Sequence, residues 1–266
     1  MFAQINGVQL AYSDTAEGAP VVLLVHGFPL NRAMWDPQIG TLRAAGLRVI
    51  APDLRAFGAS EAGPPGPLTM EQHADDLAAL LDHCGVAEPI VYVGLSMGGY
   101  VGFAFWRRYP ERVRAFVLAD TRAQPDTPEG REMRQTMAEQ AERSNSPQPA
   151  IDAMRPRLFS PHLIEGALPK RVTLGIMAGA SARAVADGAR GLAARMDSTP
   201  TLPTITVPTL VIVGEHDQLT PPADSEAIAA AIPGAKLASI EQSGHMSNLE
   251  NPDAFNAAVL ELLLDL

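Results

Sequence analysis

One serine in the chain lies in a setting that suits a nucleophile. Residues Gly94–Gly98 read Gly-Leu-Ser-Met-Gly; they follow a short apolar run, Ile90–Val93, and precede a segment of helical character. This pattern predicts a strand, a sharp turn and a helix, with Ser96 at the turn. Glycines around the serine provide the clearance that lets strand and helix pass closely. A serine in that position can attack a carbonyl carbon, whereas the simpler alternative is that Ser96 only caps the helix.

A nucleophilic serine needs a base that accepts its proton and a carboxylate that holds the base in the right tautomer. In a parallel sheet the loops that follow the strands converge at one edge, so both partners are expected directly after strands. Asp217 and His245 each follow an expected strand. Asp120 also ends an expected strand and remains the alternative acid. The sequence therefore predicts a catalytic triad of Ser96, Asp217 and His245.

Acyl transfer also needs backbone N–H groups that bind the negative oxygen of the tetrahedral intermediate, each worth about 2.7–4 kcal/mol. One is expected from Met97, the residue after the nucleophile. The other is expected from the loop His26-Gly27-Phe28-Pro29, which follows an apolar strand. Proline has no N–H, so Phe28 is the predicted donor. We interpret His26 as a residue that hydrogen-bonds the turn backbone, and His73 as an exposed or hydrogen-bonded helix residue. Loop positions predict four apolar neighbours of the substrate: Leu30, Trp35, Leu219 and Met246.

The order of expected elements indicates an α/β protein. Eight strands are expected, at residues 2–5, 9–13, 21–25, 48–51, 90–93, 115–118, 209–213 and 236–240. The first two flank Asn6-Gly7, which is typical of an antiparallel hairpin. The others alternate with helices, as in a mainly parallel sheet with helices on both faces. The alternation stops at residues 122–204, where helices are expected at Glu129–Arg143, Ala150–Leu158, Leu163–Ala178 and Ser181–Met196. We therefore predict a core in two parts, 1–121 and 205–266, with an inserted helical lid at 122–204.

Composition excludes several classes of partner. The 266 residues carry a net charge of −10, which disfavours binding to nucleic acid and to anionic membrane surfaces. No apolar run approaches the roughly 18–20 residues that span a bilayer, and the first residues do not resemble a signal peptide. Cys84 is the single cysteine, which is consistent with a reducing, cytoplasmic location. No residue cluster has the spacing of metal ligands, so neither metal nor cofactor is expected. Whether copies of the chain form a homo-oligomer is left open.

Together these motifs resemble those of the α/β-hydrolase superfamily. The matching pieces are residues 26–29, 53–60 and 94–99, Gly214-x-x-Asp217 and Gly244-His245. The chain order serine, aspartate, histidine is also that of α/β-hydrolases. The resemblance implies an α/β-hydrolase fold with an eight-stranded, mainly parallel sheet, and a cofactor-free serine hydrolase that forms an acyl-enzyme. Within the superfamily the chain is similar to small bacterial esterases and 3-oxoadipate enol-lactonase-like proteins, which implies a small ester or lactone as substrate.

The resemblance leaves alternative functions open, and one residue departs from the family pattern. A serine nucleophile is unlike the aspartate of haloalkane dehalogenases and epoxide hydrolases. Cofactor-free perhydrolases (non-haem haloperoxidases) and carbon–carbon bond hydrolases use the same triad and stay open. A non-catalytic ligand-binding protein would be expected to lack a triad residue, and none is missing. Ala56 stands where the family usually has glycine; if its φ is positive, alanine costs on the order of 1 kcal/mol.

Overall fold

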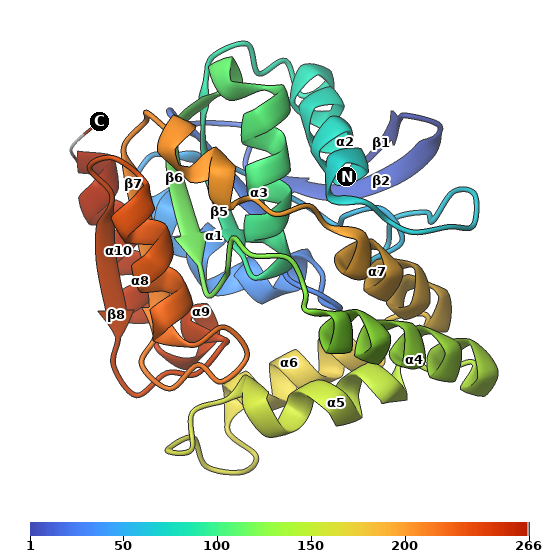
Figure 1. The fold of residues 1–266 in the computed structure, drawn as a ribbon. Coiled ribbons are helices and arrows are strands. Elements are labelled where there is room, and N and C mark those ends of the chain that lie inside the picture. Colours follow the sequence, from blue (N-terminus) through green and yellow to red (C-terminus); the bar gives the residue numbers. More distant parts are fainter. Residues whose placement is uncertain (265) are drawn as a thin grey trace.

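The strands of the protein form one mixed sheet, seen in Figure 1. The computed structural model describes residues 1–264 and 266, in which eight strands pair in the order β1-β2-β4-β3-β5-β6-β7-β8. Their bounds are β1 (Phe2–Ile5), β2 (Val8–Asp14), β3 (Val21–Val25), β4 (Arg48–Pro52), β5 (Ile90–Leu95), β6 (Val113–Ala119), β7 (Thr209–Gly214) and β8 (Lys236–Ile240). β2 is antiparallel to both β1 and β4, and all further neighbours are parallel. The predicted mainly parallel, eight-stranded sheet is thus confirmed.

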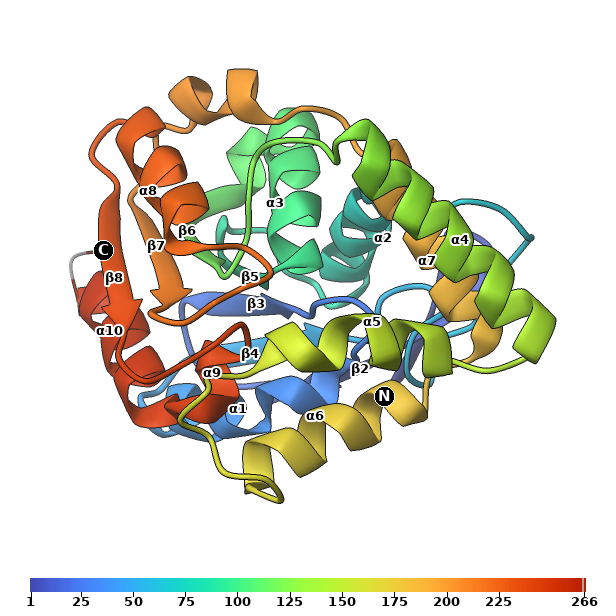
Figure 2. The same ribbon diagram turned by 60° about the horizontal axis from the view of Figure 1, so that its bottom comes forward.

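Helices cover both faces of this sheet, which is why its central strands are almost continuous apolar runs. In Figure 2 α2, α3 and α8 lie above the sheet, and α1 and α10 lie below it. Their bounds are α1 (Asp36–Ala44), α2 (Met70–His83), α3 (Met97–Arg108), α8 (Pro222–Ala231) and α10 (Pro252–Leu264); η1 (Arg32–Trp35), η2 (Pro110–Arg112), η3 (Thr199–Thr204) and α9 (Ser247–Glu250) are short. Among the described residues, no helix combines the length and apolar character that crossing a bilayer requires.

A helical insertion separates β6 from β7. Residues 122–204, all described, contain α4 (Pro128–Ser144), α5 (Gln148–Leu158), α6 (Leu168–Ala178) and α7 (Ala182–Ala194), and no strand. In both ribbon views the four helices lie together outside the core. The expected helix at Leu163–Ala178 begins only at Leu168, because Gly166 adopts a φ of 79°, which a helix cannot continue through.

Candidate active site

Ser96 occupies the sharp turn between β5 and α3. Its φ of 54° and ψ of −112° belong to a region that residues with a Cβ rarely adopt, as in the strained turn of a nucleophile elbow. A Cβ on Gly98 would lie 2.1 Å from the carbonyl oxygen of Val25, so only glycine permits this approach. Thr121 Oγ1 donates a hydrogen bond of 2.8 Å to the Ser96 carbonyl and holds the turn. The Ser96 side chain makes no capping hydrogen bond to α3, so the simpler interpretation of a helix cap is wrong.

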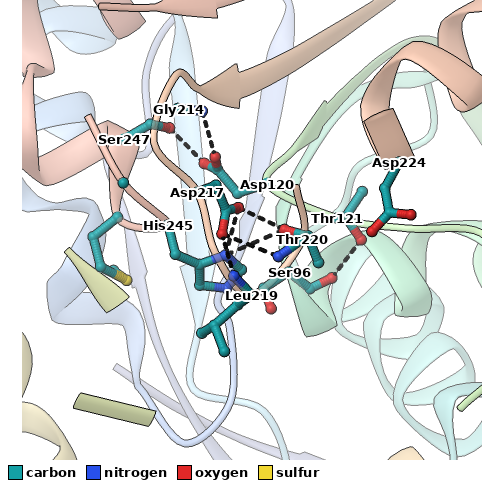
Figure 3. A network of polar contacts seen from close by, with 12 residues as sticks. Ser96, Asp120, Thr121, Gly214, Asp217, Leu219, Thr220, Asp224, His245 and Ser247 are labelled. Atoms are coloured by element: carbon teal, nitrogen blue, oxygen red, sulfur yellow. Dashed lines mark hydrogen bonds and ion pairs between the residues drawn. The ribbon is translucent and has the colours of Figure 1, made fainter. Parts of the chain in front are cut away.

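His245 and Asp217 are buried and hydrogen-bonded to each other. His245 Nδ1 and Asp217 Oδ2 are 2.8 Å apart, and Thr220 Oγ1 donates to the same carboxylate oxygen at 2.6 Å. The backbone N–H groups of Leu219 and Thr220 donate to Asp217 Oδ1 at 2.8 and 3.0 Å. Figure 3 shows this network next to Ser96, which lines the same cavity as His245. The structure therefore brings the three predicted triad residues together.

Asp120, the alternative acid, faces other partners. Its carboxylate accepts hydrogen bonds from Gly214 N at 2.8 Å and from Ser247 Oγ (Figure 3). No hydrogen bond joins Asp120 to His245 among residues 1–264 and 266. Burial, and then the nearby charge of Asp217, raise the pKa of Asp120 well above its usual range. Asp217, and not Asp120, is thus the carboxylate that orients the histidine.

The electrostatics of the pair suit a general base. Burial alone would raise the pKa of Asp217, but the charge of His245 and the hydrogen bonds from His245 and Thr220 hold it below its usual range. Burial alone would lower the pKa of His245, but the charge and hydrogen bond of Asp217, with the charge of Asp120, raise it. The environment therefore favours the imidazolium that forms when His245 accepts a proton.

Two backbone N–H groups are free to bind an oxyanion. Those of Phe28 and Met97 donate to no protein acceptor within the described part of the chain, and both residues line the cavity beside Ser96. These are the two predicted donors.

His26 hydrogen-bonds the turn backbone, as the sequence predicted, and thereby orients one of these donors. Its Nε2 accepts a hydrogen bond of 2.9 Å from the N–H of Leu54, so Nδ1 carries the proton and donates to the Gly27 carbonyl at 2.9 Å. The N–H of Leu30 donates to the same carbonyl. Since that carbonyl belongs to the peptide unit whose N–H is that of Phe28, both bonds hold the Phe28 donor in place.

The site opens into a cavity of about 630 Å³ between the core and the insertion. α4 and α5 supply much of its apolar lining, namely Met133, Met137, Ala153 and Met154. The core supplies Phe28, Ser96, Met97, Tyr100, Leu219, Thr220 and His245. Of the predicted substrate neighbours, Leu219 lines this cavity.

The other three predicted neighbours need correction, because within the described residues Leu30, Trp35 and Met246 do not line the cavity. All three are buried. The Trp35 ring packs against Phe255 of α10, with ring centroids 6.1 Å apart. A loop position indicates which segment reaches a site, but not the direction in which each side chain points. Sequence reasoning also missed Thr220, although it lies only three residues after the acid.

Two further expectations from the sequence concern His73 and Ala56, which lie near Phe57. His73 is fully buried, and neither ring nitrogen has a hydrogen-bond partner; burial lowers its pKa to about 3. The prediction of an exposed or hydrogen-bonded histidine is therefore wrong, since His73 is in the apolar layer with Phe57, 6.4 Å away between ring centroids. Ala56 has a φ of 73°, the conformation in which alanine is strained and glycine is not.

Comparison with known proteins agrees with this geometry. Residues 22–258 match the alpha/beta hydrolase family. The chain is 32% identical to 3-oxoadipate enol-lactonase 2 of Acinetobacter baylyi, over 90% of this chain and 87% of the relative. Among solved structures it is similar to a thermophilic esterase from Thermogutta terrifontis with malate bound, at TM-score 0.94 and 41% identity, over 100% of this chain and 98% of that one. It is also similar to the enol-lactonase from Burkholderia xenovorans, at TM-score 0.90 and 31% identity, over 99% and 100% of the two chains. The chain belongs to the α/β-hydrolase family and is an enzyme of its esterase and enol-lactonase-like kind.

Proposed function

We propose that the protein is a serine hydrolase that cleaves small carboxylic esters or lactones through an acyl-enzyme. The observation that carries this proposal is the 2.8 Å contact between His245 Nδ1 and Asp217 Oδ2, beside a serine on a strained turn. The relatives named as an esterase and as enol-lactonases support esters and lactones as the substrate class.

The reaction begins when Ser96 Oγ attacks the carbonyl carbon while His245 Nε2 takes the serine proton. Asp217 keeps the imidazole in the tautomer that leaves Nε2 free. The N–H groups of Phe28 and Met97 bind the negative oxygen that develops on the substrate. The tetrahedral intermediate collapses, and His245 protonates the leaving alkoxide. In a lactone that alkoxide belongs to the same molecule, so it stays attached to the acyl-enzyme.

Water then attacks the acyl-enzyme, with His245 as its base, and the second intermediate releases the carboxylic acid and restores Ser96. Every group in this cycle is a protein group or water. We assign the helical insertion, residues 122–204, the role of a lid, because α4 and α5 line the cavity opposite the core, with both apolar and charged side chains. Met137 and Met154 on these helices line the cavity, and we assign them the role of receiving the acyl chain.

Hydrolysis of p-nitrophenyl acetate, p-nitrophenyl butyrate and an enol-lactone tests the proposal. The wild type should turn over at least one of them, and Ser96→Ala should lower kcat by about 10⁴-fold or more, because no nucleophile remains. Ser144→Ala, at the exposed end of α4, is the matched control and should retain wild-type rates. A wild type that cleaves none of these substrates and is not labelled by a fluorophosphonate contradicts the proposal.

A further inference from the structure

Glu250 links the histidine loop to the helical insertion. This half-buried residue ends α9, five positions after His245. Its Oε1 accepts hydrogen bonds from Gly244 N at 3.0 Å and Met246 N at 3.3 Å, the residues on either side of His245. Its Oε2 accepts a bond of 2.9 Å from Ser160 N, which lies just beyond α5. One carboxylate therefore holds both segments.

The same two segments also touch directly. The backbone N–H of His245 donates a hydrogen bond of 2.9 Å to the carbonyl of Leu158, the last residue of α5. A Cβ on Gly244 would lie 2.5 Å from Ser160 N, so glycine is required where the backbones meet. The backbone of His245 is thus in direct contact with the C-terminal end of α5.

We propose that Glu250 is a positioning residue for His245 and that it couples the imidazole to the base of the insertion. This inference rests on the proposed function, in which His245 is the general base. A displacement of α5 would be transmitted through Glu250 to the residues on both sides of His245. The helices that shape the acyl pocket would then move together with His245, the general base.

The arrangement requires a carboxylate in particular. An ionised carboxylate has two oxygens that only accept, and here both face N–H donors. Glutamine has one oxygen, and its NH₂ group would oppose either the Ser160 N–H or the N–H groups of the histidine loop. Substitution with glutamine therefore leaves the size of the side chain almost unchanged but removes the hydrogen bonding to one of the two segments.

Two pairs of variants separate positioning from folding. Glu250→Gln should lower kcat/KM for p-nitrophenyl butyrate by about 10–100-fold, because a small misplacement of a catalytic group costs that much. Its control, Glu215→Gln, removes an exposed carboxylate that accepts a bond from Gln242 N in the same loop but has no hydrogen bond or ion pair with residues 122–204, all of which the structure describes. This control should stay within about twofold of wild type in kcat/KM, since the contact it alters is solvent-exposed.

The second pair alters the donor on the insertion. Ser160→Pro removes the N–H that donates to Glu250, and the preceding residue, Phe159, already has the extended backbone (φ −120°, ψ 153°) that a following proline needs. Ser160→Ala keeps the N–H and should retain wild-type rates, whereas Ser160→Pro should lower kcat/KM by about tenfold. Glu250→Gln should cost less in the Ser160→Pro background, because the opposing N–H is gone.

A readout without substrate distinguishes failure of this inference from failure of the proposed function. The proton between His245 Nδ1 and Asp217 should give a downfield ¹H NMR resonance, which Glu250→Gln should shift or broaden and Glu215→Gln should not. His245 is surrounded by the charges of Asp217, Asp120 and Arg122, which all these variants retain. Glu250→Gln also removes a negative charge that acts on His245, but Ser160→Pro keeps that charge and should still shift or broaden the resonance. If the wild type cleaves no ester, the proposed function fails while the resonance still tests the link. The proposed coupling would be overturned if folded Glu250→Gln and Ser160→Pro proteins kept the wild-type resonance and the wild-type rate of fluorophosphonate labelling.

Discussion

At the scale of single residues, two buried aspartates near His245 differ in their preferred protonation state. Asp217 has hydrogen-bond donors around both oxygens and a histidine beside it, and its pKa lies below the usual range. Asp120 has two donors and no cation in direct contact, and burial with the charge of Asp217 raises its pKa. Neighbouring carboxyl groups with divergent pKa values take different roles. Asp217 favours the charged form beside His245, and Asp120 favours the neutral form, hydrogen-bonded to Gly214 N and Ser247 Oγ.

Substitution of each aspartate by asparagine should separate these roles. Asp217→Asn should lower kcat by about 10³–10⁴-fold, because the amide stabilises the wrong tautomer and no charge supports the imidazolium. Asp120→Asn should lower it less than about tenfold, because asparagine resembles a neutral carboxyl and can still accept from Gly214 N. Steady-state ester hydrolysis measures both. Equal losses would instead make Asp120 part of the catalytic machinery.

The raised pKa of His245 sets the pH dependence of the reaction. Only the neutral imidazole can accept the proton of Ser96, so kcat/KM should rise with pH as His245 deprotonates. Because its pKa is raised, the midpoint should lie above the value of about 6.5 of a free imidazole. Asp217→Asn removes the largest raising contribution and should move the midpoint of its residual activity to lower pH. Profiles of kcat/KM for both proteins check this, and a wild-type midpoint below 6.5 would contradict it.

At the scale of elements, the site depends on how closely β5, α3 and the loop after β3 approach one another. A Cβ added to Gly94 would lie 2.4 Å from the Gly98 carbonyl oxygen, and a Cβ added to Gly98 would lie 2.1 Å from the Val25 carbonyl oxygen. Both obstacles are backbone atoms, which cannot rotate away as a side chain can. The strained turn at Ser96 persists because these contacts leave the chain no other path.

Gly98→Ala should therefore lower the free energy of unfolding by more than about 2 kcal/mol or prevent folding, and should abolish fluorophosphonate labelling. Gly40→Ala is the matched control, since Gly40 is exposed on α1 and a Cβ there would meet nothing within 4 Å. It should raise stability by about 0.5–1 kcal/mol, because alanine favours the helix. Urea unfolding compares the two. A Gly98→Ala protein as stable and reactive as wild type would show that the backbones can separate.

At the scale of the whole molecule, the cavity is lined by two parts of the chain, the sheet core and the helical insertion. The sheet core contributes Ser96, Thr220 and His245, each after a strand, and the insertion contributes both apolar and charged side chains from α4 and α5. We therefore propose that the core supplies the reacting groups and that the insertion shapes the acyl pocket, as is usual where function resides in loops on a rigid scaffold. Residues of α5 that line the cavity but lie away from its C-terminal end, which contacts His245, can then alter the choice of acyl group.

Ala153→Phe tests that division. Ala153 lies on α5, has an exposed side chain and lines the cavity, so a larger side chain there should occupy space for the acyl group. The ratio of kcat/KM for p-nitrophenyl octanoate to that for the acetate should fall by at least about tenfold. Ala194→Phe, at the exposed end of α7 and outside the cavity, is the control and should leave the ratio unchanged. An unaltered ratio in Ala153→Phe would mean that the acyl group lies elsewhere.

The sequence by itself determined the features that depend on neighbouring residues. The Asn6-Gly7 hairpin, the apolar central strands and the glycine-lined turn at Ser96 follow from local sterics and from burial on both faces, and all are present in the fold. The chemistry of serine, histidine and carboxylate, with strands before each, was sufficient to select Ser96, Asp217 and His245, which the fold brings together. The strain at Ala56 could likewise be anticipated from its position alone.

Tertiary structure alone decided the features that depend on distant packing. Asp217 and Asp120 both end strands in the sequence, and only their three-dimensional surroundings show which one meets His245. Trp35 packs in the core against Phe255, and α4 and α5 supply only part of the apolar lining of the cavity. Glu250 reaches Ser160, 90 positions away. Such contacts join segments with no local relation, so their energies depend on how the helices pack and not on any sequence pattern.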